Sequence, residues 1–272
     1  GRITKHGYCV VLLLITALIL SSVQTAVAEE YFNKSFEWYY KGNRWTWNLS
    51  IPKSLYDSYK RVSVSDRIRY GFAGYGFLVT TQDSYVRLVA NKLHEAAVDE
   101  GYEAYDEVSF VLAFVQSLPY TSDLVTTGYD EYPRFPIETL VDGGGDCEDT
   151  SILFATITLI LNYDTVFISL PQHLAVGVWG TNVPGYYYTY HDRTYYYCET
   201  TGENWEIGDI PNEYQGTLAN IYSINQNTQY DPTQDLANPF SSLLVPLMVF
   251  AVVLLGTVIG LLYAFKRLRK KP

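Results

Sequence analysis

The feature that most constrains this chain is an uncharged apolar run near its C-terminus, residues 240–265 (FSSLLVPLMVFAVVLLGTVIGLLYAF). A run of this length can cross the hydrocarbon core of a bilayer as a tilted helix. Lysine and arginine dominate the following residues, 266–272, and such a tail is typical of the cytoplasmic side. We therefore expect a transmembrane helix over 240–265 that contacts membrane lipid, a basic cytoplasmic tail, and the body of the chain outside the membrane.

A second, shorter apolar run lies at the N-terminus. Arg2 and Lys5 precede the apolar stretch Tyr8–Leu20, and Ala26–Ala28 supplies a small-x-small cleavage pattern. The pattern predicts a cleaved signal peptide over 1–28, which leaves a single-pass protein of the cell membrane. The alternative is an uncleaved N-terminal anchor helix, which makes the protein two-pass.

Two Asn-x-Ser sequons follow this leader, at Asn33 and Asn48. Glycosylation at such sites belongs to exported proteins, so the sequons agree with an ectodomain outside the cell. Asn33 and Asn48 are therefore candidate glycosylation sites.

Composition limits the partners that this chain can bind. The 272 residues are 48% apolar and 18% charged, with a net charge of −10, whereas nucleic acid requires a basic face. No nucleic-acid partner is expected. The 26 tyrosines are explained by rings that cover an amphipathic surface, and a carbohydrate- or peptide-binding face is the alternative.

The remaining sequence divides into an aromatic-rich N-terminal region over 29–80, a core domain over 81–215 and a polar linker over 216–239. Within the first of these, Phe36–Ile51 is predicted to form a β-hairpin because aromatic arms flank the turn signal KGN.

The core domain is expected to be an α+β fold. Apolar periodicity predicts helices over 81–100 and 106–118 and a buried helix over 147–161. Residues 120–140 contain two prolines and are expected to be a loop. β-rich stretches separated by turns then predict an antiparallel meander with strands at 165–170, 173–179, 186–190 and 194–200.

A lone cysteine, Cys147, stands where the buried helix begins. The three preceding glycines, 143–145, allow a sharp turn and a close backbone approach, and the helix N-terminus favours a thiolate. His173 opens one later strand and Glu199 lies on another, so the chain could supply a nucleophile, a base and an orienting acid. A buried structural cysteine is the alternative interpretation of Cys147.

Three segments together carry a family resemblance: Gly144–Asp149 before an apolar helix, His173–Val178 (HLAVGV) and Tyr195–Gly202 (YYYCETTG). This combination resembles the transglutaminase-like superfamily of cysteine proteases, and most of all its membrane-anchored prokaryotic, especially archaeal, members. Two upstream segments, Phe114–Tyr120 and Tyr132–Pro136, resemble the same group.

The resemblance implies a papain-like core in which a cysteine-bearing helix packs on an antiparallel sheet. It implies Cys147 as nucleophile, His173 as general base and acid, and Glu199 in a third position that the family often fills with Asp. The implied activity is acyl transfer on a protein or peptide, through a thioester. Water as acceptor makes a peptidase, isopeptidase or deamidase, with cell-envelope crosslinks among the substrates, and an amine makes a crosslinking enzyme.

Other residues near these three are candidates for metal binding or oxyanion stabilisation. Asp146 and Glu148 flank the cysteine, where some related bacterial proteases bind calcium; acids that are solvated or cap the helix are the alternative. The chemistry requires no cofactor, but negative neighbours raise the pKa of a thiol, so His173 or a cation must offset them. Gln116 is a candidate oxyanion donor, with an amide that bridges core elements as the alternative.

A different class of function also fits the sequence. The domain could be a non-catalytic binding or assembly subunit that holds membrane-protein partners in a membrane or cell-surface complex. Strand alternation sends Cys198 away from the face that carries Glu199, so Cys198 is predicted to be a buried free thiol.

Overall fold

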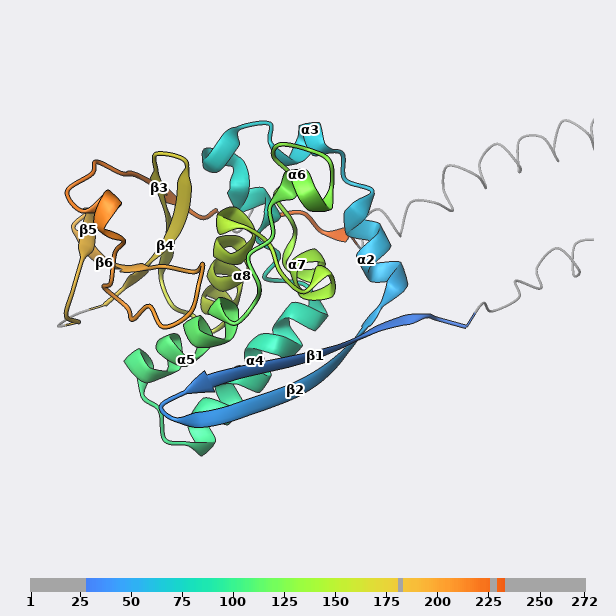
Figure 1. Ribbon diagram of the computed structural model, residues 1–272, viewed down its shortest axis with the longest axis horizontal. Coiled ribbons are helices and arrows are strands. Elements are labelled where there is room, and N and C mark those ends of the chain that lie inside the picture. Colours follow the sequence, from blue (N-terminus) through green and yellow to red (C-terminus); the bar gives the residue numbers. More distant parts are fainter. Residues whose placement is uncertain (1–27, 181–182, 226–228, 233–272) are drawn as a thin grey trace, which may run out of the picture.

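The computed structural model describes residues 28–180, 183–225 and 229–232 (Figure 1). The predicted leader, apart from its last residue, the transmembrane run over 240–265 and the basic tail lie outside these ranges. Within the ranges, no helix is both long enough and apolar enough to cross a bilayer. The membrane-spanning segments therefore stay predictions.

The predicted N-terminal hairpin is confirmed. Strands β1 (Tyr31–Tyr40) and β2 (Asn43–Pro52) pair antiparallel in continuous register. The turn between them, Lys41 and Gly42, has positive φ at both residues (48° and 79°), which suits the right-handed twist of a two-residue hairpin. The hairpin packs on α5 (Ala104–Gln116; Figure 1) and shares the main hydrophobic core, so it is part of the domain.

The three predicted helices are confirmed within a few residues. They are α4 (Ser84–Asp99), α5 (Ala104–Gln116) and α8 (Cys147–Ile160). Helix α4 begins at its cap because the Asp83 carboxylate accepts the backbone N–H groups of Tyr85 and Val86. Shorter helical segments precede α4: α2 (Lys53–Lys60), α3 (Val64–Arg67) and the 3-10 helix η1 (Gly71–Leu78).

The loop predicted over 120–140 is wrong in part, because the structure places two short helices there. They are α6 (Asp123–Thr126) and α7 (Pro136–Asp142). Pro136 occupies the first turn of α7, where a missing N–H costs nothing and the fixed φ suits a helix. The apolar residues of α7 are buried, so packing stabilises this helix. The sequence pattern did not predict it because its proline suggested a loop.

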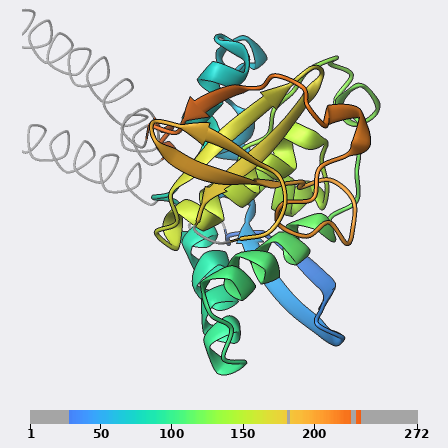
Figure 2. The ribbon, with the colours of Figure 1, turned by 90° about the vertical axis from the view of Figure 1, so that its left-hand side faces the viewer.

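All four predicted strands form, and they make one curled antiparallel sheet. They are β3 (Thr165–Leu170), β4 (His173–Trp179), β5 (Tyr187–Tyr190) and β6 (Arg193–Cys198), in the spatial order β5-β6-β4-β3. Helix α8 packs against one face of the sheet, through β4 and β3 (Figure 2). The α+β prediction is confirmed at this level of a helical layer on an antiparallel sheet.

One strand was not predicted. After the 3-10 helix η2 (Asn212–Tyr214), residues Asn220–Ser223 form β7, which pairs with β3 at the sheet edge. This segment lies inside the predicted polar linker over 216–239, so at least its first part belongs to the folded domain. Ile221 and Tyr222 provide the strand's apolar contacts, one with each of the two hydrophobic clusters.

Candidate functional site

The three glycines before Cys147 have the geometry that the sequence predicted. Gly143 ends α7 with φ of 76°, in the left-handed region that favours glycine. A Cβ on Gly144 would collide with the carbonyl oxygen of Pro119, and one on Gly145 would collide with Asp149. The backbone thus approaches both neighbours closely and delivers Cys147 as the first residue of α8.

His173 and Glu199 form a direct pair across the sheet. The His173 Nε2 and Glu199 Oε2 atoms lie 2.9 Å apart, and both side chains are buried. This contact leaves Nδ1 as the ring nitrogen that can exchange a proton with another group. The pair supplies a base whose ring orientation is fixed by a carboxylate.

The Glu199 carboxylate is itself held by three further donors. Its Oε2 accepts the Tyr197 hydroxyl at 2.8 Å, and its Oε1 accepts the Thr201 hydroxyl at 2.5 Å and the Thr201 backbone N–H at 3.1 Å. Burial raises the pKa of Glu199, but the hydrogen bond and charge of His173, with the Thr201 and Tyr197 hydrogen bonds, outweigh it and leave the pKa below its usual value. Glu199 is therefore an ionised acceptor for the imidazole.

Buried hydroxyls fasten the start of α8 to the segments that carry the other two residues. The Ser151 hydroxyl donates to the Leu174 carbonyl, next to His173, at 2.9 Å. The Thr150 and Ser151 hydroxyls also contact the Thr200 hydroxyl, next to Glu199, at 2.9 and 3.0 Å. These bonds tie the helix that begins at Cys147 to the segments that carry His173 and Glu199.

An aromatic side chain that the sequence did not single out covers the histidine. The Tyr214 ring, from η2, stacks on the His173 ring with centroids 5.0 Å apart and an angle of 4° between the planes. Burial raises the pKa of Tyr214, and the negative charges of Glu213 and Glu199 raise it further. No sequence signal distinguishes Tyr214 from the other tyrosines, because its contact with His173 joins distant segments.

Gln116 has a different role from the predicted oxyanion donor. It is 4% exposed, and its Nε2 donates to two backbone carbonyls, those of Glu199 at 2.7 Å and Trp205 at 3.0 Å. Both amide hydrogens are thereby occupied. Gln116 instead bridges α5 to the segment after β6 and holds the Glu199 backbone in place. This bridge is the alternative that the sequence left open.

The Cys147 thiol is protonated in this arrangement. Among the described residues its side-chain hydrogen bond goes to Glu148 Oε2, at 3.3 Å, and none joins it to His173. Burial raises the pKa of the thiol, and the charges of Glu148 and Asp146 raise it further, against an opposing contact from the Leu174 backbone N–H. The thiol needs a change in its negative surroundings before it can act as a thiolate.

Those surroundings are a cluster of three acids, of which the sequence predicted two. Oxygen atoms of Asp123, Asp146 and Glu148 all lie within 4.8 Å of one another. Burial raises the pKa of Glu148 to about 10, with Asp146 as the largest charge contribution, and burial raises that of Asp123 to about 6. Asp146 Oδ1 is buried with no hydrogen-bond partner in the described chain. Carboxylate oxygens with an unsatisfied atom among them fit a hard divalent cation such as Ca²⁺.

Asp123 joins the cluster because a buried arginine holds α6 in place. Arg134 Nη1 binds Asp123 at 2.7 Å and also binds Asp149, while its Nε binds Asp142 at 3.0 Å. The Arg134 backbone N–H donates to Asp149 at 2.6 Å. Asp123 could not be identified from its spacing, because the contact runs through a loop and a buried ion pair.

The remaining candidate residues lie apart from this site. Asn33 and Asn48 are both exposed on the hairpin, and each amide oxygen accepts the serine hydroxyl of the other sequon, at 2.6 and 2.5 Å. Cys147 and Cys198 are not joined by a disulfide, and Cys198 is a buried free thiol, as predicted.

The lowered pKa of Glu199 predicts how replacing it by glutamine will affect stability. Because the folded-state pKa lies below the unfolded value, ionised Glu199 stabilises the fold above the unfolded pKa, and this contribution is lost as pH falls through the folded pKa. We expect Glu199→Gln to lower the free energy of unfolding by about 1–3 kcal/mol at neutral pH, and by less in acid. Urea unfolding of both proteins at neutral and acidic pH tests this, with the exposed Glu100→Gln as control. A deficit of equal size at both pH values would contradict it.

No protein-family model and no curated protein matches the chain. Among solved structures it is similar to LapG of Legionella pneumophila. The calcium-bound form is 15% identical, with 68% of this chain and 95% of that chain covered and a TM-score of 0.28. A second LapG structure is 16% identical, with 57% and 75% covered and a TM-score of 0.26, and the EGTA-treated form is 16% identical, with 54% and 69% covered and a TM-score of 0.25. Likenesses of this size carry no argument about the site, which rests on the contacts described above.

Proposed function

We propose that this chain is a cysteine acyl-transfer enzyme of the transglutaminase-like type, acting as a peptidase or isopeptidase. The observation that carries the proposal is the buried His173–Glu199 pair, tied by hydroxyl contacts to the helix that begins at Cys147. The pair fixes the orientation of the imidazole ring and leaves Nδ1 for proton exchange, as a general base requires.

The residues suggest a sequence of proton transfers. His173 accepts the thiol proton of Cys147 as the sulfur attacks an amide carbonyl, and the resulting imidazolium is stabilised by Glu199. The Cys147 backbone N–H lies at the first position of α8, where the helix provides no acceptor, and can bind the oxyanion. His173 then gives its proton to the leaving amine, and water resolves the thioester.

Asp123, Asp146 and Glu148 would hold a divalent cation beside this site. A bound cation would offset the negative charge that raises the pKa of the Cys147 thiol. Nothing in the transfer steps requires the ion as a reactant.

Thiol reactivity tests both the nucleophile and the cation. We expect iodoacetamide to alkylate Cys147 of the full chain at neutral pH, several-fold faster in millimolar calcium than in chelator, because the cation lowers the thiol pKa. Glu148→Gln should remove the calcium dependence, and Glu100→Gln should keep it. Peptide mapping separates Cys147 from the buried Cys198. Alkylation only in alkali, with or without calcium, would contradict an activated thiol.

A non-catalytic binding or assembly subunit is the second candidate, which one observation favours: the thiol hydrogen-bonds to Glu148, and among the described residues no hydrogen bond joins it to His173. A Cys147→Ala variant that keeps every cellular function would support it. In either case we propose an ectodomain outside the cell, anchored by residues 240–265, with a protein or peptide as partner.

A further inference from the structure

A groove of about 630 Å³ lies beside Gln116, whose amide donates to the Glu199 carbonyl. The tip of the hairpin, helix α5 and the loop after β6 form its walls, and Gln116 belongs to its lining. Its volume is in the range of pockets that bind small molecules or a few side chains. None of the triad residues lines it.

The loop wall of this groove combines aromatic and acidic side chains. Trp205 is half-buried, and the exposed Glu203 and Glu206 stand on either side of it in the sequence. Neither carboxylate makes an ion pair or a side-chain hydrogen bond with the described residues, whereas the other two acids of the groove, Glu37 and Asp106, pair with Arg44 and Lys41. Two unpaired carboxylates beside an indole ring fit a cationic side chain, which gains from charge and from the ring face.

The hairpin wall adds an unsatisfied donor. Trp38 lines the groove, is 5% exposed, and its buried indole N–H has no hydrogen-bond partner among the described residues. A buried donor without a partner is rare and costs free energy. This N–H is closed off from solvent, so a bound chain would meet other atoms of Trp38 in the groove wall.

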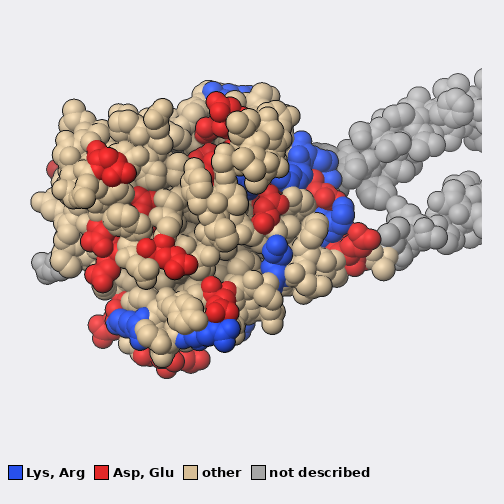
Figure 3. All heavy atoms as spheres, in the orientation of Figure 1, with Lys and Arg blue, Asp and Glu red and all other residues tan. Residues whose placement is uncertain are grey.

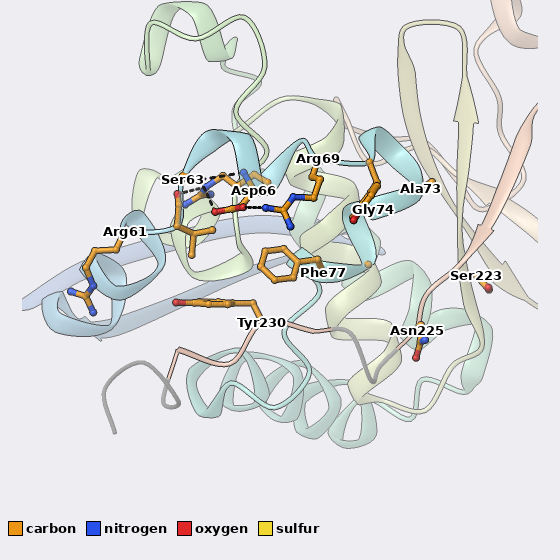
Figure 4. Close-up of a pocket in the computed structure, with 14 residues that line it drawn as sticks. Arg61, Ser63, Asp66, Arg69, Ala73, Gly74, Phe77, Ser223, Asn225 and Tyr230 are labelled. Carbon is orange, nitrogen blue, oxygen red and sulfur yellow. Dashed lines mark hydrogen bonds and ion pairs between the residues drawn. The ribbon is translucent and has the colours of Figure 1, made fainter. Parts of the chain in front are cut away.

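The other large cavity does not share these features. It measures about 590 Å³ and lies between α3, η1 and the segment around Tyr230 (Figure 4). Its acid, Asp66, is already bound by Ser63 and Arg69, as the dashed lines show. Figure 3 shows acidic and no basic side chains over the upper left part of the visible face, where the sheet lies in Figure 1.

We infer that the groove between Trp38, Trp205 and Tyr105 binds a lysine- or arginine-bearing segment of a polypeptide substrate. Such a segment can place its cationic side chain against Trp205 and between Glu203 and Glu206. The inference rests on the proposed function, because it names the substrate class of that site. Gln116 connects the groove to the candidate site, because its amide donates to the carbonyls of both Trp205 and Glu199.

Calorimetry on the full Cys147→Ala chain in detergent micelles measures peptide binding without turnover. The binding result therefore stands even if the proposed acyl transfer is wrong. The probes are a short acetylated peptide amide with two lysines and its counterpart with norleucine in their place. We expect the lysine peptide to bind roughly tenfold more tightly, with an advantage that shrinks at high salt.

Matched variants locate the binding. Glu203→Gln with Glu206→Gln should remove the advantage of the lysine peptide. The control, Asp99→Asn with Glu100→Gln, removes the same charge from two exposed residues at the end of α4 and should keep the advantage. Trp205→Leu should weaken both peptides. Equal binding of the two peptides, an advantage that survives the Glu203 and Glu206 changes, or binding of chitohexaose in place of peptide would overturn the inference.

Discussion

Replacing Cys147 by alanine is expected to lower kcat/KM for peptide hydrolysis by about 10⁴-fold or more. The reason is that the thiol is the group that we propose to form the covalent intermediate, and without it the His173–Glu199 pair has no nucleophile to activate. The measurement is turnover of a peptide substrate by the full chain, with purified wild type and variant compared at equal concentration.

Two further variants make this result specific. His173→Ala should cause a loss of similar size, because triad residues act as a unit, and Cys198→Ala should leave kcat/KM within a few-fold of wild type. Cys198 is a buried free thiol on the opposite side of β6 from Glu199. Equal losses from Cys147→Ala and Cys198→Ala would point to a structural role for both thiols.

Replacing Arg134 by methionine is expected to lower the free energy of unfolding by about 3–5 kcal/mol. Arg134 is 1% exposed and binds Asp123 and Asp149, which are equally buried. Methionine fills part of the volume but leaves these carboxylates without a counter-charge in the interior. Chemical denaturation of the full chain, followed by tryptophan fluorescence, measures the loss.

The matched control is Arg193→Met. Arg193 binds Asp164 at the surface, with more than half of the arginine side chain exposed, and exposed pairs contribute about 0–1 kcal/mol. Because both variants remove one arginine charge, the ratio of their losses in unfolding free energy shows how much of the Arg134→Met effect comes from burial. A loss below about 1 kcal/mol for Arg134→Met would show that this network does not hold the cluster together.

The sequence predicted those parts of the fold whose pattern is local. Apolar periodicity identified α4, α5 and α8, and turn residues identified the hairpin and four strands. Helix α7 was missed because Pro136 suggests a loop until the proline is seen in the first helical turn. Strand β7 was missed because only four residues pair, in a polar stretch whose partner β3 lies far away in the sequence.

The candidate site shows the same division. Cys147, its glycines, His173 and Glu199 were identified because the residue type and its neighbours suggest the chemistry. Asp123 and Tyr214 reach the site through tertiary contacts with Arg134 and His173, and such contacts have no signature in spacing. For Gln116 the sequence left two roles open, an oxyanion donor or an amide that bridges core elements, and the two carbonyls that its amide binds decide for the bridge.

The most direct test of the account is to look for the acyl-enzyme. The full chain is mixed with an activated peptide ester, quenched in acid, and the mass of each cysteine-containing fragment is measured. The account predicts an acyl adduct on Cys147 in wild type and in Cys198→Ala, and its loss in His173→Ala. An adduct that forms equally without His173, or no adduct on Cys147 with calcium present, would contradict it.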